Sequence, residues 1–410
     1  MNKIVCLFIA GAVFSCKKDN IPGPVTAVSK VEVALTASLD SIRNQGIFNG
    51  FGVAVVTADS IVYQNGFGFA DRAAGLPYTV DTRQPIASVS KTFIGVALLK
   101  AQEMGKLKLD DPVNKYLPFK VSNPEFPHID ITIGHLATHT STINDEGTSY
   151  MQEAYVADKD IPASEYPDYD QSFNAPSTDK GLEAFLQKEL GGSGADYSGG
   201  AYNSFMPGQY YEYSNMGATL AALVLEKATG MPYDAFVAKY ILQPLGMKHS
   251  GFYGKDTDYK GRSLLYINPD KPLPQYHCIT YPDGGMVTSA GDMALYLQEL
   301  VRGYSGSGKL LSKESYKELF TTYLGPRSFL DGQETENPYS DEYNSGLFIG
   351  FSPEGYIGHT GGDPGISSLM FFDPKTGVGR FLMVNTDSND KKGNDAFYAI
   401  WDKLSAAIKK

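Results

Sequence analysis

The sequence predicts an α+β fold, in which one antiparallel sheet is flanked by helices and a mostly helical subdomain is inserted between its strands. Two observations carry this prediction. Short runs rich in β-branched and aromatic residues gather near both ends of the chain, at 51–64 and 346–386. The stretch between them shows the periodicity of helices at 86–104, 217–242, 290–301 and 312–320 instead. Strands from the two ends are therefore expected to pair with each other around a helical middle.

The first third of the chain is expected to supply a helix, a β-hairpin and one long apolar helix. The hairpin turns near Asp59, between two runs of β-branched residues. The apolar helix stops at Gly105, a residue that commonly ends helices. The expected elements are a helix at 29–45, strands at 51–57 and 60–64, a helix from 86 to 104 and a short helix within 131–140.

Residues 141–205 differ from their surroundings and read as a long acidic insertion. They hold 12 acidic side chains and 3 lysines, with many Tyr, Ser and Gly, and helical periodicity is clear only at 182–190. A long segment of weak regularity is typically either a functional lid or disordered. We expect an acidic, tyrosine-bearing flap near the functional site, and a mobile surface insertion is the alternative.

The second half returns to regular patterns and ends in strands. Ser289 and Asp292 have the spacing of a helix capping box. Trp401, the only tryptophan, lies in the closing amphipathic helix. The expected helices are 217–229, 233–242, 290–301, 312–320 and 395–408, and the expected strands are 284–289, 346–351, 355–359, 368–372 and 379–386.

Residues 1–15 are typical of a secretion signal. Lys3 precedes an apolar run that ends at Phe14, which is shorter than the ~20 residues needed to span a bilayer. Ser15 and Cys16 follow, and this junction resembles the lipobox of bacterial lipoproteins, in which the cysteine is acylated. We therefore expect a signal peptide at 1–15, a lipid-attached linker at 16–28 and a folded domain at 29–410. The protein would then be exported as a periplasmic or cell-surface lipoprotein, and a plain secreted protein is the alternative.

The net charge argues against some classes of binding partner, and the cysteine content argues against a disulfide. The 410 residues carry a net charge of -11, which argues against nucleic acid and against an anionic membrane surface. Contact with a membrane would be through the N-terminal lipid alone. Cys278 has no partner in the expected mature chain, since Cys6 lies in the signal and Cys16 would be lipidated, so no disulfide is expected.

Ser88 and Lys91 stand one turn apart at the start of the long apolar helix. Residues at i and i+3 are neighbours on a helix surface, so the ammonium can reach the hydroxyl. The helix start also offers unpaired N–H groups that favour negative charge on a substrate. The spacing is weak by itself, because it recurs at Ser15/Lys18, Ser177/Lys180 and Ser388/Lys391, and a serine cap on a core helix is the structural alternative.

Two further motifs follow in order. Tyr213-Ser214-Asn215 precedes a helix, and His359-Thr360-Gly361-Gly362 lies between two strands. IASVSKTF, YSN and HTG in this order resemble the three motifs of the penicillin-recognising serine hydrolases, which include class C β-lactamases, D-alanyl-D-alanine carboxypeptidases, D-aminopeptidases and esterases. The likeness extends through 105–118, 131–141, 242–252 and 283–297, and thus over most of residues 48–386.

The resemblance implies a β-lactamase/transpeptidase-like fold and a set of roles. Ser88 would be the acylated nucleophile, with Lys91 and Tyr213 preparing it and Tyr213 protonating the leaving group. Substrate-binding roles would fall to Asn215, His359, Thr360 and Gly361. The backbone N–H groups of Ser88 and Gly362 would form the oxyanion hole.

His359 departs from the lysine that class C β-lactamases generally carry at this position. A histidine titrates near neutrality, so the permanent cation for a β-lactam carboxylate is absent. His135 and His139 stand four residues apart on one expected helix, where packing and capping is the preferred interpretation. No metal site and no cofactor are expected.

The sequence thus predicts an exported serine hydrolase acting through an acyl-enzyme on an amide or ester. The leading substrate is a D-amino-acid-containing peptide, as for a D-alanyl-D-alanine carboxypeptidase or D-peptidase, with β-lactams as possible covalent ligands. Alternatives are an esterase, a class C-type β-lactamase, and a non-catalytic peptide-binding lipoprotein of the same fold.

Overall fold

The computed structural model describes residues 30–160, 173–192, 200–252, 261–330, 339–340 and 344–405. The expected signal peptide, Cys16 and the linker lie outside these residues, as does the centre of the acidic insertion. Across the described part of the chain, no helix is both long and apolar enough to cross a membrane.

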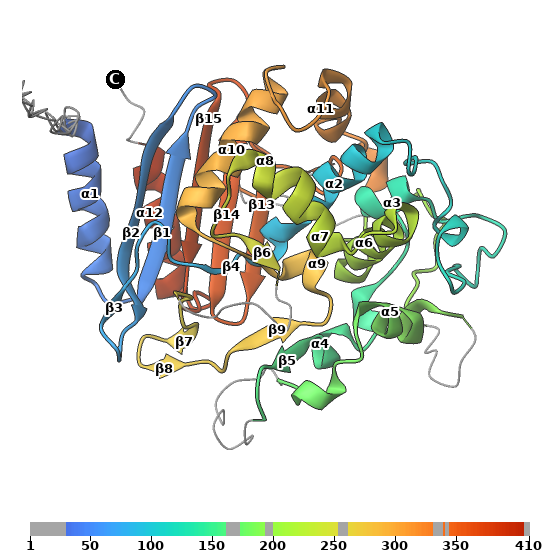
Figure 1. Cartoon of the computed structure of the whole chain (residues 1–410), viewed down its shortest axis with the longest axis horizontal. Helices are drawn as coiled ribbons and strands as arrows, with labels where there is room; N and C mark the ends of the chain where they lie inside the picture. The colour runs from blue at the N-terminus through green and yellow to red at the C-terminus, as the bar shows by residue number, and fades with distance from the viewer. Residues whose placement is uncertain are drawn as a thin grey trace, which may run out of the picture.

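One antiparallel sheet is the centre of the molecule, and it joins the two ends of the chain as predicted (Figure 1). The N-terminal hairpin pairs with the last strand, so that Val53 lies opposite Leu382. In spatial order the strands are β11 (Asn344–Ser345), β12 (Gly350–Phe351), β13 (Ile357–Asp363), β14 (Ile366–Asp373), β15 (Val378–Val384), β1 (Gly50–Val56), β2 (Ile61–Asp71) and β3 (Leu76–Pro77).

Both faces of this sheet are buried, because successive strand residues alternate between two cores. Val53 and Leu382 pack with Trp401 under the terminal helices α1 (Lys30–Arg43) and α12 (Lys391–Leu404). Ala54 and Phe381 face the other core, beneath α10 (Ala290–Tyr304) and the helical region beyond it (Figure 1). The sheet is therefore the middle layer of three, with helices on both sides.

The helical region runs from β4 to β11 in sequence, and its described residues form three small sheets. Its helices are η1 (Ala87–Ser90), α2 (Lys91–Glu103), η2 (Val113–Lys115), α3 (Ile133–Ala137), η3 (Asp145–Gly147), α4 (Tyr150–Glu153), η5 (Pro176–Thr178), α5 (Leu182–Leu190), α6 (Asn215–Thr229), α7 (Tyr233–Val237), η6 (Ala238–Leu242), α8 (Gln243–Leu245), α9 (Tyr281–Gly284), α10, α11 (Lys313–Leu319) and η7 (Pro326–Ser328). The small sheets join β4 (Gln84–Pro85), β10 (Met286–Thr288) and β6 (Gly251–Phe252), then β5 (Tyr155–Ala157) with β9 (Tyr276–Cys278), and β7 (Tyr266–Asn268) with β8 (Lys271–Pro272).

Three local predictions were wrong. Residues 346–351 do not form one strand, because Phe348 adopts a left-handed φ of 53° and turns the chain before β12. His139 does not share a helix with His135, because α3 ends at Ala137. The reciprocal capping box at α10 is incomplete: Ser289 accepts from the Asp292 N–H, but the Asp292 carboxylate accepts instead from His249 and Ser250.

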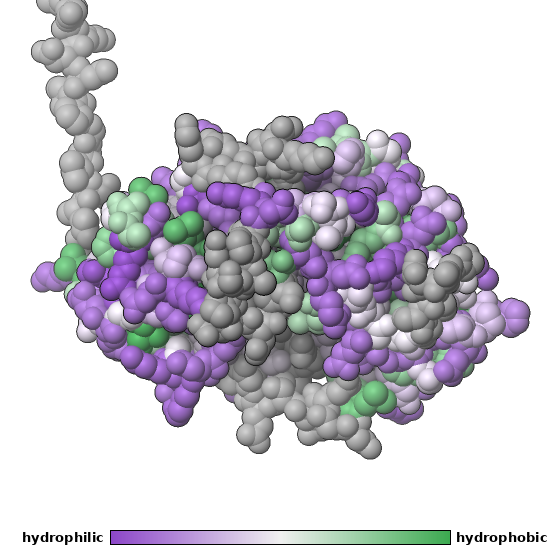
Figure 2. Space-filling model, turned by 90° about the horizontal axis from the view of Figure 1, so that it is seen from below, coloured by the Kyte–Doolittle hydropathy of each residue, from purple (hydrophilic) through white to green (hydrophobic). Residues whose placement is uncertain are grey.

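The surface seen in Figure 2 is mostly hydrophilic where residues are described, and hydrophobic residues lie there singly or in small groups. This pattern is ordinary for a face in contact with water.

Candidate active site

Ser88 lies in the short helix η1, immediately before α2 and below the end of β13. Ala87, which precedes it, has a φ of 48°. A left-handed conformation costs a non-glycine residue roughly 1 kcal/mol or more, and such strain concentrates at functional sites. The turn holds Ser88 half-buried at the N-terminal end of α2.

Lys91 is completely buried, and its ammonium points to three oxygen atoms. Nζ donates to Ser88 Oγ at 2.9 Å, to Asn215 Oδ1 at 2.6 Å and to the Asp283 carbonyl at 3.0 Å. An ammonium has three N–H donors, so these acceptors match its charged form. The structure therefore brings residues of the first two motifs together around one amine.

Tyr213 completes this group from the chain just before α6. Its ring centroid lies 5.0 Å from Lys91 Nζ and 6.2 Å from the His359 ring centroid. On its other side the His139 ring stacks at 4.6 Å, and His139 Nδ1 accepts from the Ser214 N–H at 3.2 Å. His139 has a φ of 55°, so a second left-handed residue fixes the Tyr213 ring. His139 therefore positions Tyr213, which is more than the packing and capping expected for it from the sequence.

Asp145 is the residue of this site that sequence reasoning missed most clearly. Its carboxylate accepts from Ser214 Oγ at 2.7 Å, from the Asn215 N–H at 2.7 Å and from the Met216 N–H at 3.1 Å. A carboxylate at a helix N-terminus satisfies unpaired N–H groups and the helix dipole. Asp145 belongs to the acidic insertion, so the start of that segment orients the Tyr-Ser-Asn motif.

We expect Asp145→Asn to lower kcat/KM by roughly 10- to 100-fold, because hydrogen bonds to a charged group are worth about 1.5–3 kcal/mol. The asparagine amide keeps the shape of the carboxylate, but its NH2 group would face hydrogen-bond donors that the carboxylate oxygens accept from. Steady-state kinetics on an activated ester would measure the effect. Glu146→Gln removes the same charge from the exposed neighbour in η3 and should leave kcat/KM within about twofold. An equal loss in both variants would show that charge in the insertion, not the contacts of Asp145, is responsible.

The HTGG segment forms the end of β13 beside Ser88. A side chain at Gly361 would meet the Ser368 hydroxyl, the Ile86 carbonyl and, at 3.2 Å, the Ser88 nitrogen. Gly362 is exposed, and a side chain there would meet nothing within 4 Å. Glycine at 361 therefore lets the strand approach Ser88, whereas the open space at Gly362 is on the opposite face of β13. His359 is buried, and its Nδ1 donates to the Thr360 carbonyl at 2.7 Å.

Two buried carboxyl groups lie behind the Ser-Lys pair. Burial raises the pKa of Asp283 to about 6 and that of Asp363 to about 7. Asp283 accepts from Thr219 Oγ1 at 2.9 Å, and Asp363 accepts from the Tyr155 hydroxyl at 2.5 Å. Tyr155 belongs to the acidic insertion, so a tyrosine of that segment contacts the residue that follows the HTGG motif. Neither carboxyl group was singled out from the sequence.

Two further histidines, His135 and His277, have structural contacts. His135 and Thr132 form a reciprocal capping box at α3, as the capping interpretation predicted. His277 lies between Asp158 at 3.0 Å and Asp179 at 3.3 Å, and although burial opposes it, these hydrogen bonds raise its pKa to about 9. Among the described residues, no three His, Cys, Asp or Glu side chains gather in a way that could hold a metal ion.

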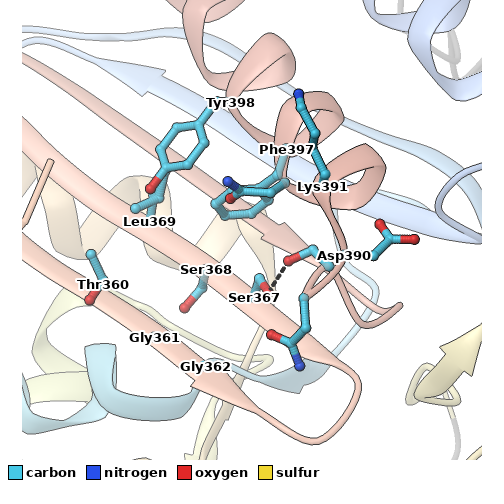
Figure 3. Close-up of a pocket in the computed structure, with 13 residues that line it drawn as sticks. Thr360, Gly361, Gly362, Ser367, Ser368, Leu369, Asp390, Lys391, Phe397 and Tyr398 are labelled. Carbon is cyan, nitrogen blue, oxygen red and sulfur yellow. Dashed lines mark hydrogen bonds between the residues drawn. The ribbon is translucent and has the colours of Figure 1, made fainter. Parts of the chain in front are cut away.

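A pocket of about 580 Å³ lies on the other face of β13, under the N-terminal end of α12 (Figure 3). Thr360 points into it, whereas Gly361 packs toward Ser88 on the opposite face. Ser367 and Ser388 hydrogen bond across its floor at 2.6 Å. Its volume is that of a small-molecule site, although Ser88 does not line it.

Relatives in sequence cover most of the chain. Residues 35–405 match the Beta-lactamase family. Protein flp of Staphylococcus aureus (strain MW2) is 27% identical over 350 residues, which are 84% of this chain and 61% of that protein. Penicillin-binding protein 4* of Bacillus subtilis (strain 168) is 26% identical over 82% of this chain and 68% of its own length. This chain thus spans only about 61% of the flp protein.

Solved structures support the same fold. The octameric penicillin-binding protein homologue from Pyrococcus abyssi has a TM-score of 0.67 at 24% identity, covering 93% of this chain and 78% of that one. The D-amino acid amidase from Ochrobactrum anthropi SV3, complexed with L-phenylalanine, has a TM-score of 0.67 at 22% identity, covering 93% and 100%. At these identities the likeness concerns the fold, which is the β-lactamase/transpeptidase-like fold expected from the motifs. With a family match over nearly its whole length, the chain belongs to the Beta-lactamase family.

Proposed function

We propose that the protein is an exported serine hydrolase that forms an acyl-enzyme at Ser88 with an amide or ester. The leading substrate class is a D-amino-acid-containing peptide or amide. The observation that carries the proposal is the convergence on the buried Lys91 ammonium of Ser88 Oγ, Asn215 Oδ1 and the Tyr213 ring.

In this proposal Tyr213 is the general base. Lys91 serves as an ammonium in this proposal, since Asn215 Oδ1 and the Asp283 carbonyl can only accept from Nζ and Ser88 Oγ lies 2.9 Å from it. Its positive charge beside the Tyr213 ring favours the phenolate form of that side chain. Tyr213 would remove the Ser88 proton as Oγ attacks the substrate carbonyl carbon, and then return it to the leaving nitrogen or oxygen.

The carbonyl oxygen would gain negative charge between the N–H groups of Ser88 and Gly362. Loss of one donor of this type typically costs about 10²- to 10³-fold in kcat. Asn215 would hold Lys91 and the acyl part of the substrate, and His359 would face the site from β13. Thr360 points into the pocket on the opposite face of β13, so its side chain has no part in this proposal. Water would then attack the acyl-enzyme along the reverse path and release the acid.

The substrate class rests on two supports. His359 stands where class C β-lactamases generally carry a lysine, which speaks against a dedicated β-lactamase. Solved relatives of the same fold include a D-amino acid amidase and penicillin-binding proteins. Export as a lipoprotein through Cys16 belongs to the proposal and rests on the first 28 residues of the sequence alone.

Intact-mass spectrometry of the wild-type protein with penicillins, D-alanyl amides and short esters tests this function. We expect a covalent adduct that peptide mapping places on Ser88, with faster turnover for D-alanyl compounds than for penicillins. If neither these compounds nor a fluorophosphonate modified Ser88, a non-catalytic peptide-binding protein of the same fold would be favoured. Rapid turnover of short esters alone would indicate an esterase.

A further inference from the structure

The pocket of about 580 Å³ on the face of β13 opposite Ser88 has no role in the proposed reaction (Figure 3). One wall is the outer face of the sheet, with Thr360 of β13 and Leu369 of β14. The other wall is the N-terminal end of α12, with Phe397 and Tyr398. The volume is in the range of small-molecule sites, so the side chains that line the pocket indicate which kind of ligand it suits.

The two charged side chains that line the pocket already have partners. Asp390 caps α12, since its carboxylate accepts from the Gly393 N–H at 2.6 Å. Lys391 pairs with Asp395 at 2.6 Å, one turn further along the helix. The positive end of the helix dipole therefore faces a carboxylate of the protein itself, and the two opposite charges in the pocket balance. These contacts favour a neutral ligand over an anion or a cation.

Two asparagines at the rim present amide groups that are available to a ligand. Asn389 and Asn394 are exposed, and within the described ranges neither side-chain amide makes a hydrogen bond. Each amide offers a carbonyl acceptor and two N–H donors. Ser367 and Ser388 hydrogen bond to each other at 2.6 Å on the floor, and their oxygens keep acceptor positions. A ligand with both donors and acceptors around its edge matches this set.

Apolar surface completes the pocket. Phe397 and Tyr398 project from α12, and Leu369 projects from β14 (Figure 3). Aromatic rings present flat, apolar faces to a ligand. A sugar ring has the matching pattern, because its C–H groups form an apolar face while its hydroxyl groups surround the edge. The combination of rings, hydroxyls and amides therefore suits a saccharide.

The sheet beneath the pocket argues against an extended peptide as the ligand. β13 and β14 pair throughout this region, with Thr360 opposite Leu369 and Gly362 opposite Ser367. β14 pairs on its other side with β15, so that Ser367 lies opposite Val384. Extended peptides commonly bind by adding a strand to a free sheet edge. A pocket on the face of a sheet offers side chains and no free row of backbone groups, so recognition here is by side chains.

We propose that this pocket binds a neutral N-acetylated saccharide, as a second site separate from the catalytic face of β13. An acetamido group carries one N–H donor and one carbonyl acceptor, which together match the primary amide of Asn389 or Asn394. The rings of Phe397 and Tyr398 then contact the apolar face of a sugar ring, and the serine hydroxyls of the floor face its hydroxyl groups. Binding here is independent of an acyl-enzyme at Ser88.

Isothermal titration calorimetry with N,N′-diacetylchitobiose tests this site. We expect saturable binding to the wild-type protein, and the same Kd within about twofold for Ser88→Ala. Asn389→Ala and Asn394→Ala should each raise Kd by about 2- to 10-fold, the range of one neutral hydrogen bond. Both positions are exposed, so neither change disturbs the core. Asn44→Ala is the matched control, because it removes an exposed asparagine amide just after α1, outside the pocket, and it should leave Kd unchanged.

Cellobiose provides the comparison ligand, since it has two sugar rings and no acetamido group. We expect it to bind about 10-fold more weakly than diacetylchitobiose. No saturable binding of diacetylchitobiose, equal affinity for cellobiose, or a Kd unchanged in both Asn389→Ala and Asn394→Ala would overturn the proposal. Displacement of the sugar by D-alaninamide, or loss of binding in Ser88→Ala, would also overturn it by placing the sugar on the catalytic face. A Ser88 that forms no adduct, with sugar binding intact, would contradict the proposed function instead.

Discussion

Ser88→Ala is expected to lower kcat by on the order of 10⁴-fold or more and to abolish the covalent adduct. The expectation follows from the proposed acyl-enzyme, because alanine leaves no nucleophile while the oxyanion hole and the binding contacts remain. Residual turnover from those elements alone is therefore small but measurable. Stopped assays with an activated D-alanyl ester, read together with intact-mass spectra, would measure both effects. Binding of D-alaninamide should persist, since the hydroxyl is removed without adding bulk.

The chain offers a matched control for this change in a second Ser-x-x-Lys sequence. Ser388 and Lys391 have the same spacing, but Ser388 Oγ bonds to Ser367 and Lys391 pairs with Asp395 in an exposed turn of α12. Ser388→Ala should leave kcat within about twofold. If Ser388→Ala were as damaging as Ser88→Ala, the pocket under α12 would take part in the reaction, and the assignment of Ser88 as sole nucleophile would fail.

The parts of the fold predicted from sequence are those fixed by local pattern. Runs rich in β-branched and aromatic residues, such as 51–57 and 379–386, predicted strands of the central sheet. The stop at Gly105 predicted the end of α2, where Gly105 is left-handed and follows the Met104 cap. The Ser88–Lys91 contact also follows from spacing on one helix turn. By contrast, Phe348 broke an expected strand because tertiary packing holds it in a conformation that its side chain disfavours locally.

The supporting groups of the candidate site could not be predicted, because they act over long sequence separations. Asp145 bonds to residues about 70 positions away, and Tyr155 reaches Asp363 across about 200. Neither pairing leaves a periodic pattern in the sequence, because each depends on how the acidic insertion folds against the end of β13. The position of Asp363 directly after HTGG was the one available hint. A strand residue two places beyond Gly361 must share its face.

Lys91→Met should lower kcat/KM by roughly 10³-fold while leaving Tm within about 3 °C of wild type. Methionine matches the length of the lysine stem, so the packing of α2 against its neighbours is kept. The ammonium that orients Ser88 and favours the Tyr213 phenolate is lost, which removes contributions from acid–base and electrostatic catalysis together. Burying an ammonium costs several kcal/mol of desolvation free energy, and this cost disappears in the variant. The gain offsets the cost of leaving the acceptors at Asn215 and Asp283 without a donor.

Measuring kcat/KM and Tm together distinguishes a role of Lys91 in the reaction from a role in folding. Lys391→Met changes the same residue type at the surface and should alter neither kinetics nor Tm. A fall in Tm of more than about 10 °C for Lys91→Met would mean that the buried amine mainly holds α2, α6 and α9 together. Retained activity at an unchanged Tm would instead show that Tyr213 ionises without the neighbouring charge. The geometry predicts an inactive but stable variant, because other contacts also hold the elements that supply the oxygens around Nζ. Asp145 accepts a hydrogen bond from the Asn215 N–H, and Thr219 donates one to Asp283.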